Sequence, residues 1–241
     1  MEQNSECEHG MDFPTTRWTL IRQASGQSGP DARKALEELC QSYAGPVLAF
    51  IRRRVVGREE AEDATQEFFS RLLAGSLLDR ADPVSGQFRA FLLNAVRNFL
   101  SDQWDYQQAQ KRGGGVRHVA LDEINVPASR SDLSPEDEFE IQWARTILQR
   151  SLDRLMQEYI LGGKEPLWLA LQTQLDQSSV QAQQETAERL RMSHGALRVA
   201  LHRMRKRLGE LIRDEVAHTV PDTEDVEEEL QRLRSVLEKS R

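Results

Sequence analysis

A run of basic residues near the C-terminal end of the chain is the clearest candidate for binding chemistry. No acidic residue occurs between Ser193 and Leu208. Cationic side chains on one helix face neutralise phosphates and release counterions, while the first helical turns can reach base edges. The pattern predicts a duplex DNA surface, with a solvated basic helix end as the alternative. Its residues would be Ser193, His194, Ala196, Arg198, Val199, His202, Arg203, Arg205, Lys206 and Arg207.

Two amphipathic helices must position these side chains. Across residues 186–213, apolar residues recur every three or four positions, which predicts a helix-turn-helix with one small core. Ser193 is expected to cap the second helix, because its hydroxyl can accept a hydrogen bond from an N–H group of the first turn. The turn contains no glycine, and Gly195 falls inside the second helix.

A second set of polar and aromatic residues accompanies an apolar stripe at residues 87–100, which predicts a rigid helix. Aromatic rings beside Arg and Asn suit single-stranded bases, because stacking is worth roughly 1 to 3 kcal/mol per base. Burial of the two rings in a core is the alternative. The candidate residues are Asn94, Arg97, Asn98, Asp102, Trp104 and Tyr106.

Acidic residues gather in the early turns of another predicted helix, which begins after Gly57. They are Glu59, Glu60, Glu62, Asp63 and Glu67. Consecutive acids point around a helix instead of converging, and no histidine accompanies them. We therefore expect a solvated face or a protein-docking face, with no metal site and no catalytic residue.

Composition and charge limit the classes of function. The 241 residues carry a net charge of −7, but residues 189–213 are basic and residues 221–229 are acidic. Cys7 and Cys40 suggest neither a disulfide framework nor a zinc cluster. No apolar run approaches the length of a membrane span, and the N-terminus lacks the features of a signal peptide. We expect a cytoplasmic protein without membrane insertion, cofactor or small-molecule substrate.

The periodicity predicts an all-α fold of two helical domains joined by a flexible linker, which is rich in Ser, Pro, Asp and Gly. Pro46 is expected to kink or divide the first long helix. The C-terminal acidic helix is expected either to lie against Arg203 to Arg207 and lower DNA affinity, or to bind a partner. The predicted parts are an N-terminal extension at 1–29, a helical domain at 30–112, the linker at 113–137, a helix-turn-helix domain at 138–218 and the acidic helix at 219–241.

Three segments together resemble the bacterial sigma-70 family of extracytoplasmic-function type, over roughly residues 13–237. They are EEAEDATQEFFSRLL at 59–73, QFRAFLLNAVRNFLSDQWDYQQAQKR at 87–112 and ERLRMSHGALRVALHRMRKRLGELIRDEV at 188–216. The first of these segments resembles the family's region 2.2 signature. The resemblance implies that Asp63, Gln66, Glu67 and Phe68 dock on core RNA polymerase.

The same resemblance implies a role in transcription initiation for the other two segments. The polar and aromatic residues at 94–106 would recognise and melt the minus-ten promoter element, and the basic helix would read the minus-thirty-five element. Core RNA polymerase and promoter DNA are the implied partners, with an anti-sigma factor or another regulator as a further candidate. A sigma factor makes and breaks no bond, so the chain would not be an enzyme. The segment at 160–177 makes the middle of region 4 longer than the family pattern.

Two other functions remain open from the residues alone. A stand-alone helix-turn-helix repressor or activator would bind a palindromic duplex without polymerase. An enzyme acting on nucleic acid through the acids at 59–67 would show metal-dependent cleavage. A separate single-strand-binding helix favours the sigma factor, because a simple repressor has no use for one.

Overall fold

The computed structural model describes residues 30–74, 78, 88–112, 133–175, 179–220 and 225–239, with the side chains at 30–33, 35, 36 and 107–112 left out. Within these ranges every regular element is a helix, which confirms the predicted all-α class. The predicted extension at 1–29 and residues 113–132 of the predicted linker lie outside the described residues. The helices are α2 (Pro30–Arg52), α3 (Arg58–Ala74), α4 (Phe88–Arg112), α5 (Pro135–Leu161), α6 (Glu165–Leu171), the 3-10 helix η4 (Gln172–Gln174), α7 (Val180–Arg189), α8 (His194–Ala217) and α9 (Val226–Lys239).

Helices α2, α3 and α4 pack around a first core of apolar and aromatic side chains. The Tyr43 and Phe88 rings meet edge to face at 5.2 Å between centroids, and this contact joins α2 to α4. Helix α2 continues through Pro46, so Pro46 does not divide the helix, and the expected kink stays a prediction. Gly57 has φ of 107°, a conformation that glycine adopts at low cost, and it lies directly before α3.

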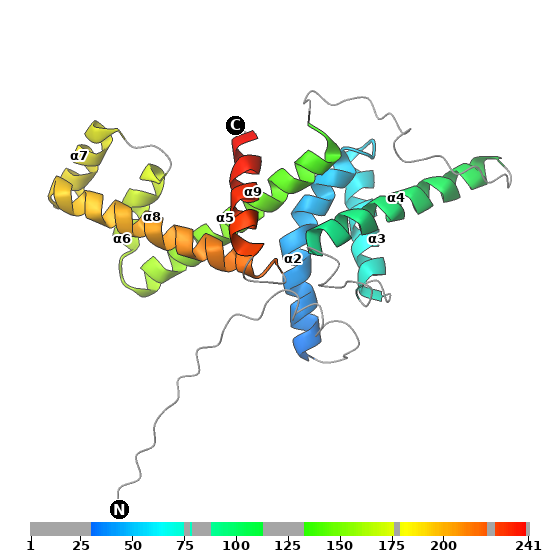
Figure 1. Ribbon diagram of the computed structural model, residues 1–241, viewed down its shortest axis with the longest axis horizontal. Helices are drawn as coiled ribbons and strands as arrows, with labels where there is room; N and C mark the ends of the chain where they lie inside the picture. The colour runs from blue at the N-terminus through cyan, green and yellow to red at the C-terminus, as the bar shows by residue number, and fades with distance from the viewer. Residues whose placement is uncertain are drawn as a thin grey trace, which may run out of the picture.

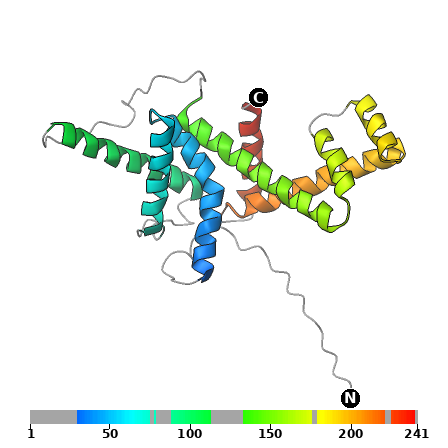
Figure 2. The ribbon, with the colours of Figure 1, turned by 180° about the vertical axis from the view of Figure 1, so that it is seen from behind.

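Helix α5 is shared by two cores (Figures 1 and 2). Its N-terminal half contributes Phe139 and Trp143 to the first core, along α2, whereas Leu155 lies in the second core beside α6 and α8. Val216, at the end of α8, returns to the first core. The division into domains at 30–112 and 138–218 stays a prediction, but side chains from both segments pack in one core.

The second core lies at the opposite end of the molecule from α3 and α4, and it contains α6, α7 and the first half of α8 (Figure 1). Gln174 in η4 is 5% exposed and donates hydrogen bonds to the Thr186 hydroxyl and, at 3.4 Å, to the Ala182 carbonyl. These bonds join η4 to α7. The long middle segment at 160–177 therefore supplies α6 and η4, which cover the helix pair α7 and α8.

The C-terminal helix α9 folds back across α5 and the second half of α8. Val226 and Leu233 are buried in the first core. Glu227 pairs with Arg213 near the end of α8. This ion pair lies more than one turn beyond Arg207, and the groove between α8 and α9 reaches back to Lys206. The expected position of the C-terminal helix against Arg203 to Arg207 stays a prediction.

Candidate nucleic-acid interface

Three of the four predicted polymerase-binding residues share the exposed face of α3. Gln66 and Glu67 follow Asp63 by three and four positions, which places all three on one side of the helix. Asp63 and Gln66 make no hydrogen bond or ion pair within the described part of the chain. Glu67 pairs with Arg71 and accepts a hydrogen bond of 2.6 Å from the Gln103 amide of α4.

The fourth residue, Phe68, faces the core. It is 1% exposed, and its ring meets Phe69 and Phe99 at centroid distances of 5.4 and 5.5 Å. A partner protein cannot touch this ring in the observed packing. The prediction that Phe68 lies on the polymerase-binding surface is therefore wrong. Its ring instead packs beneath the exposed face of α3 and fixes α3 against α4.

A line of exposed side chains runs along α4. Asn94, Asn98, Asp102 and Tyr106 are all exposed and follow one another every four residues, so they lie on neighbouring turns of one helix side. This α4 line presents amides, a carboxylate and a ring, which can hydrogen-bond base edges or stack on a base. It brings together four of the six residues predicted for single-stranded bases.

Arg97 is already paired. Its Nη2 atom lies 2.6 Å and its Nε atom 3.2 Å from Oε1 of Glu136, at the start of α5. Arg54, in the turn after α2, approaches the same oxygen at 3.3 Å. Burial would raise the pKa of Glu136, but the hydrogen bonds and charges of the two arginines outweigh it and lower that pKa. Arg97 is thus held by a carboxylate, whereas the sequence predicts that it contacts single-stranded bases.

Trp104 and Tyr106 do not form one stacking platform. Two residues correspond to a rotation of about 200° around a helix, so the two rings point to nearly opposite sides. Tyr106 is 66% exposed, whereas Trp104 is half-buried and its Nε1 atom is buried without a partner among the described residues. The Tyr106 ring is therefore free to stack on a base, whereas only part of the Trp104 ring can be reached by a base.

The outward face of α8 keeps most of the predicted duplex surface. Ser193 caps this helix by accepting a hydrogen bond of 3.1 Å from the Ala196 N–H, as the sequence predicts. The stripe of Leu197, Leu201 and Met204 is buried. Opposite or beside the stripe, the exposed residues are Ala196, Arg198, Val199, His202, Arg203, Arg205 and Lys206, and His194 at the helix start is half-buried.

The basic side chains of α8 differ in whether they have a hydrogen-bond or ion-pair partner. Arg198, His202 and Arg203 have no partner within the described ranges. Arg205 donates to the backbone carbonyls of Gln174 and Leu175 at 2.7 and 3.4 Å. Those hydrogen bonds satisfy the end of η4, so Arg205 holds the second core together and is less available to phosphates.

Arg207 is anchored to α5. It donates to both carboxylate oxygens of Glu158, and Glu210 accepts a further hydrogen bond of 3.0 Å. Hydrogen bonding to Glu158 and then to Glu210 raises the pKa of Arg207, and the Arg207 bonds lower the pKa of Glu158. The predicted duplex surface therefore divides into free cations and two cations that position α8.

A residue that the sequence analysis passed over lies in the turn before α8. Arg191 has φ of 52°, the left-handed conformation that usually takes glycine. Its N–H donates to the Glu188 carbonyl at 3.0 Å, and the Met192 N–H donates to the Ala187 carbonyl at 2.9 Å. This hydrogen-bond pair is the Schellman ending of a helix. Its sequence signal, a glycine in the turn, is missing, and an exposed cation stands there instead.

The described ranges contain neither a metal-binding cluster nor a membrane-spanning helix. No group of three or more His, Cys, Asp or Glu side chains there could hold a metal ion. Within the same residues, no helix combines the length and the apolar character needed to cross a membrane.

The segment from residue 39 to residue 110, which runs from α2 through α3 into α4, matches the family model of Sigma-70 region 2. The matched segment contains the exposed face of α3 and the α4 line, and it ends before the second core. No curated protein and no solved structure matches the chain. Residues 39–110 are therefore similar to sigma-70 region 2.

Proposed function

We propose that this chain is a bacterial sigma factor of extracytoplasmic-function type, acting in the cytoplasm. It binds core RNA polymerase and directs promoter-specific transcription initiation. In this proposal residues 39–110 bind the polymerase and open the minus-ten element, while α7 and α8 read the minus-thirty-five element. The polymerase supplies the chemistry of RNA synthesis.

The observation that carries the proposal is the match of residues 39–110 to Sigma-70 region 2. The exposed positions of Asp63, Gln66 and Glu67 support the assignment of polymerase binding to α3, because a docking face must be accessible. The α4 line supports a role in holding unstacked bases. Unstacking costs a few kcal/mol, which captured bases and backbone contacts can offset.

The basic helix supports duplex binding upstream. Arg198, His202 and Arg203 are exposed and have no partner in the described part of the chain, so they can approach phosphates without breaking an ion pair. The turn with Arg191 adds a cation directly before the helix. Cations at such positions increase affinity for duplex DNA in a salt-dependent way.

Run-off transcription from genomic promoter fragments tests the proposal. Bacterial core polymerase with the chain should give discrete transcripts that neither component gives alone. Asp63→Lys should abolish them, because it reverses charge on the exposed face of α3. Asp153→Lys, which makes the same charge change on an exposed position of α5, is the matched control and should retain them.

The opposite result identifies the alternative. If the chain binds a specific duplex alone and core polymerase gains no start sites, the protein is a stand-alone regulator. Equal loss of transcripts with both charge reversals would also overturn the assigned role of α3, since the effect would then follow net charge.

A further inference from the structure

Two oppositely charged side chains are buried between α4 and α9. Arg89 is 3% exposed and Glu229 is 1% exposed, and they form an ion pair. The Arg89 guanidinium also lies 4.5 Å from the centre of the Trp143 ring of α5. A buried charge is costly unless it is paired, so removing either partner would leave the other charge uncompensated for as long as α9 stays docked.

A third charged residue, Glu140 near the start of α5, lies beside this ion pair. Glu140 is 3.2 Å from Arg89 and 3.6 Å from Arg232 of α9. One acid of α5 is thereby held between a cation of α4 and a cation of α9. Together with buried Val226 and Leu233, this network attaches α9 to the N-terminal half of α5.

That half of α5 covers part of the candidate single-strand surface. Glu136, one turn before Glu140, holds Arg97 at 2.6 Å. The preceding carbonyl of Leu133 accepts a hydrogen bond from Arg53, which ties the same end of α5 to α2. A nucleic-acid phosphate that needs Arg97 must therefore displace the Glu136 carboxylate.

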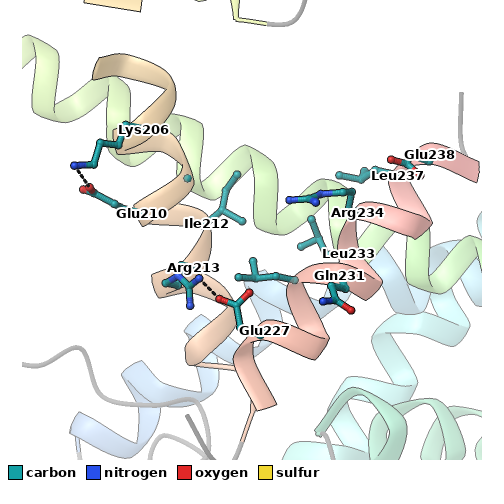
Figure 3. A pocket seen from close by; sticks show the side chains of 12 residues that line it. Lys206, Glu210, Ile212, Arg213, Glu227, Gln231, Leu233, Arg234, Leu237 and Glu238 are labelled. Carbon is teal, nitrogen blue, oxygen red and sulfur yellow. Dashed lines mark hydrogen bonds and ion pairs between the residues drawn. The ribbon is translucent and has the colours of Figure 1, made fainter. Parts of the chain in front are cut away.

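On its other side α9 is loosely packed. Figure 3 shows a groove between α8 and α9, of about 700 Å³, with Ile212, Leu233 and Leu237 among its lining residues. The ion pair between Arg213 and Glu227 spans the two helices, and both side chains are more than half exposed. Exposed ion pairs contribute little, typically below about 1 kcal/mol. The attachment of α9 therefore depends mainly on its contacts with α4 and α5.

We propose that α9 is a latch that holds the chain in a closed form, in which Glu136 competes with single-stranded promoter DNA for Arg97. Release of α9 removes Glu229 from Arg89 and Arg232 from Glu140. The first turns of α5 then lose their support, open more often, and free Arg97. This inference rests on the proposed function, in which α4 binds the opened minus-ten strand.

Point variants of the full chain test the latch. Glu229→Gln removes the buried charge of α9, and Glu228→Gln is the matched control, because Glu228 is exposed on the next position. Hydrogen exchange of residues 135–147 should become faster in Glu229→Gln and stay unchanged in Glu228→Gln. Affinity for a labelled single-stranded oligonucleotide of about 20 nucleotides should rise about fivefold or more in Glu229→Gln alone.

Two results would overturn the latch. The first is unchanged hydrogen exchange of residues 135–147 in Glu229→Gln, whatever the affinity for DNA. The second is faster exchange without tighter binding of the oligonucleotide. The double variant Arg89→Met with Glu229→Leu should close the latch again, because apolar groups often replace a buried ion pair without loss. It should restore slow exchange and weak DNA binding, and persistently fast exchange would contradict the proposal.

A second variant covers the case in which Glu229→Gln fails to fold, as judged by circular dichroism. Glu136→Gln removes the competitor of Arg97 while α9 stays in place, so it should also tighten single-strand binding. Glu138→Gln, on the same turn of α5, is its control. Equal affinity for these two variants would overturn the competition for Arg97.

The latch and the proposed function can fail separately. Exchange and oligonucleotide binding are measured without polymerase, whereas transcription requires it. A chain that directs transcription but shows no response to Glu229→Gln keeps its function and loses the latch. A chain with no polymerase-dependent transcripts loses the proposed function, whatever its exchange pattern.

Discussion

Arg207 donates hydrogen bonds from Nε and Nη2 to the two carboxylate oxygens of Glu158, at 2.9 and 2.7 Å. This two-point contact joins α8 to the C-terminal half of α5. Its neighbour Lys206 lies 4.0 Å from Glu210, at the limit of an ion pair. Adjacent cations on one helix therefore have different tasks, one in positioning the helix and one facing solvent.

The first prediction compares these neighbours. Arg207→Ala should lower the free energy of unfolding by about 0.2 to 1 kcal/mol, the usual range for exposed ion pairs. Lys206→Ala should leave stability unchanged and weaken salt-dependent duplex binding. Urea unfolding and fluorescence anisotropy measure the two quantities. Equal loss of stability in both variants would show that the Glu158 contact contributes nothing.

The second prediction concerns acid. Hydrogen bonds from Arg207 hold the pKa of Glu158 below the ordinary value, and those from Arg97 do the same for Glu136 against the opposing effect of burial. A lowered folded-state pKa means that the unfolded chain binds protons first as the pH falls. The stabilisation is therefore complete above the ordinary glutamate pKa and disappears as pH falls through the folded-state values.

Urea unfolding at pH 7 and near pH 4 checks this dependence. In Arg207→Ala the loss of stability between the two pH values should be smaller than in the unchanged protein, because Glu158 no longer has a lowered pKa. An identical loss would show that the Arg207 contact does not contribute to the acid dependence.

The third prediction concerns the turn before α8. Arg191→Gly should raise the free energy of unfolding by roughly 0.5 to 1 kcal/mol, since glycine adopts the left-handed conformation without a steric penalty. The same change should weaken duplex binding by removing a cation. Arg191→Ala is the control, with equal loss of binding and no gain in stability. A destabilised glycine variant would argue that the arginine side chain itself holds the turn.

The fourth prediction separates the two rings of α4. Tyr106→Ala should weaken single-strand binding by roughly 1 kcal/mol or more and leave the melting temperature unchanged, because the ring is exposed. Trp104→Ala should weaken promoter opening more than duplex binding, and it should also lower the melting temperature because the ring is half-buried. Permanganate footprinting measures opening. Equal loss of opening and duplex binding for Trp104→Ala would contradict its assigned role.

Much of the local structure could be predicted because it depends on neighbours in sequence. The Ser193 cap, the buried stripe of α8 and the exposed line of α4 all follow from helical periodicity and capping chemistry. The all-α class follows from the same signals. These features need no knowledge of how distant segments meet.

Other features depend on contacts between distant segments, and periodicity does not reveal them. Phe68 directly follows exposed Gln66 and Glu67, yet its ring is buried because α3 packs on α4. Glu136, the partner of Arg97, is 39 positions further along the chain. Arg89 and Glu229 are 140 positions apart, so their pairing could not be inferred from either local sequence.

Helix α5 has a geometric consequence for the whole molecule. Its 27 residues extend over about 40 Å at 1.5 Å per residue, with one end in each core. A tilt of about 10° at the end beside α2 would displace the other end by roughly 7 Å, which is comparable with the spacing of two base pairs along duplex DNA. Under the proposed function, substitutions that repack Phe139 or Trp143 should therefore change which promoter spacing the two candidate DNA surfaces span, without altering any residue proposed to touch a base.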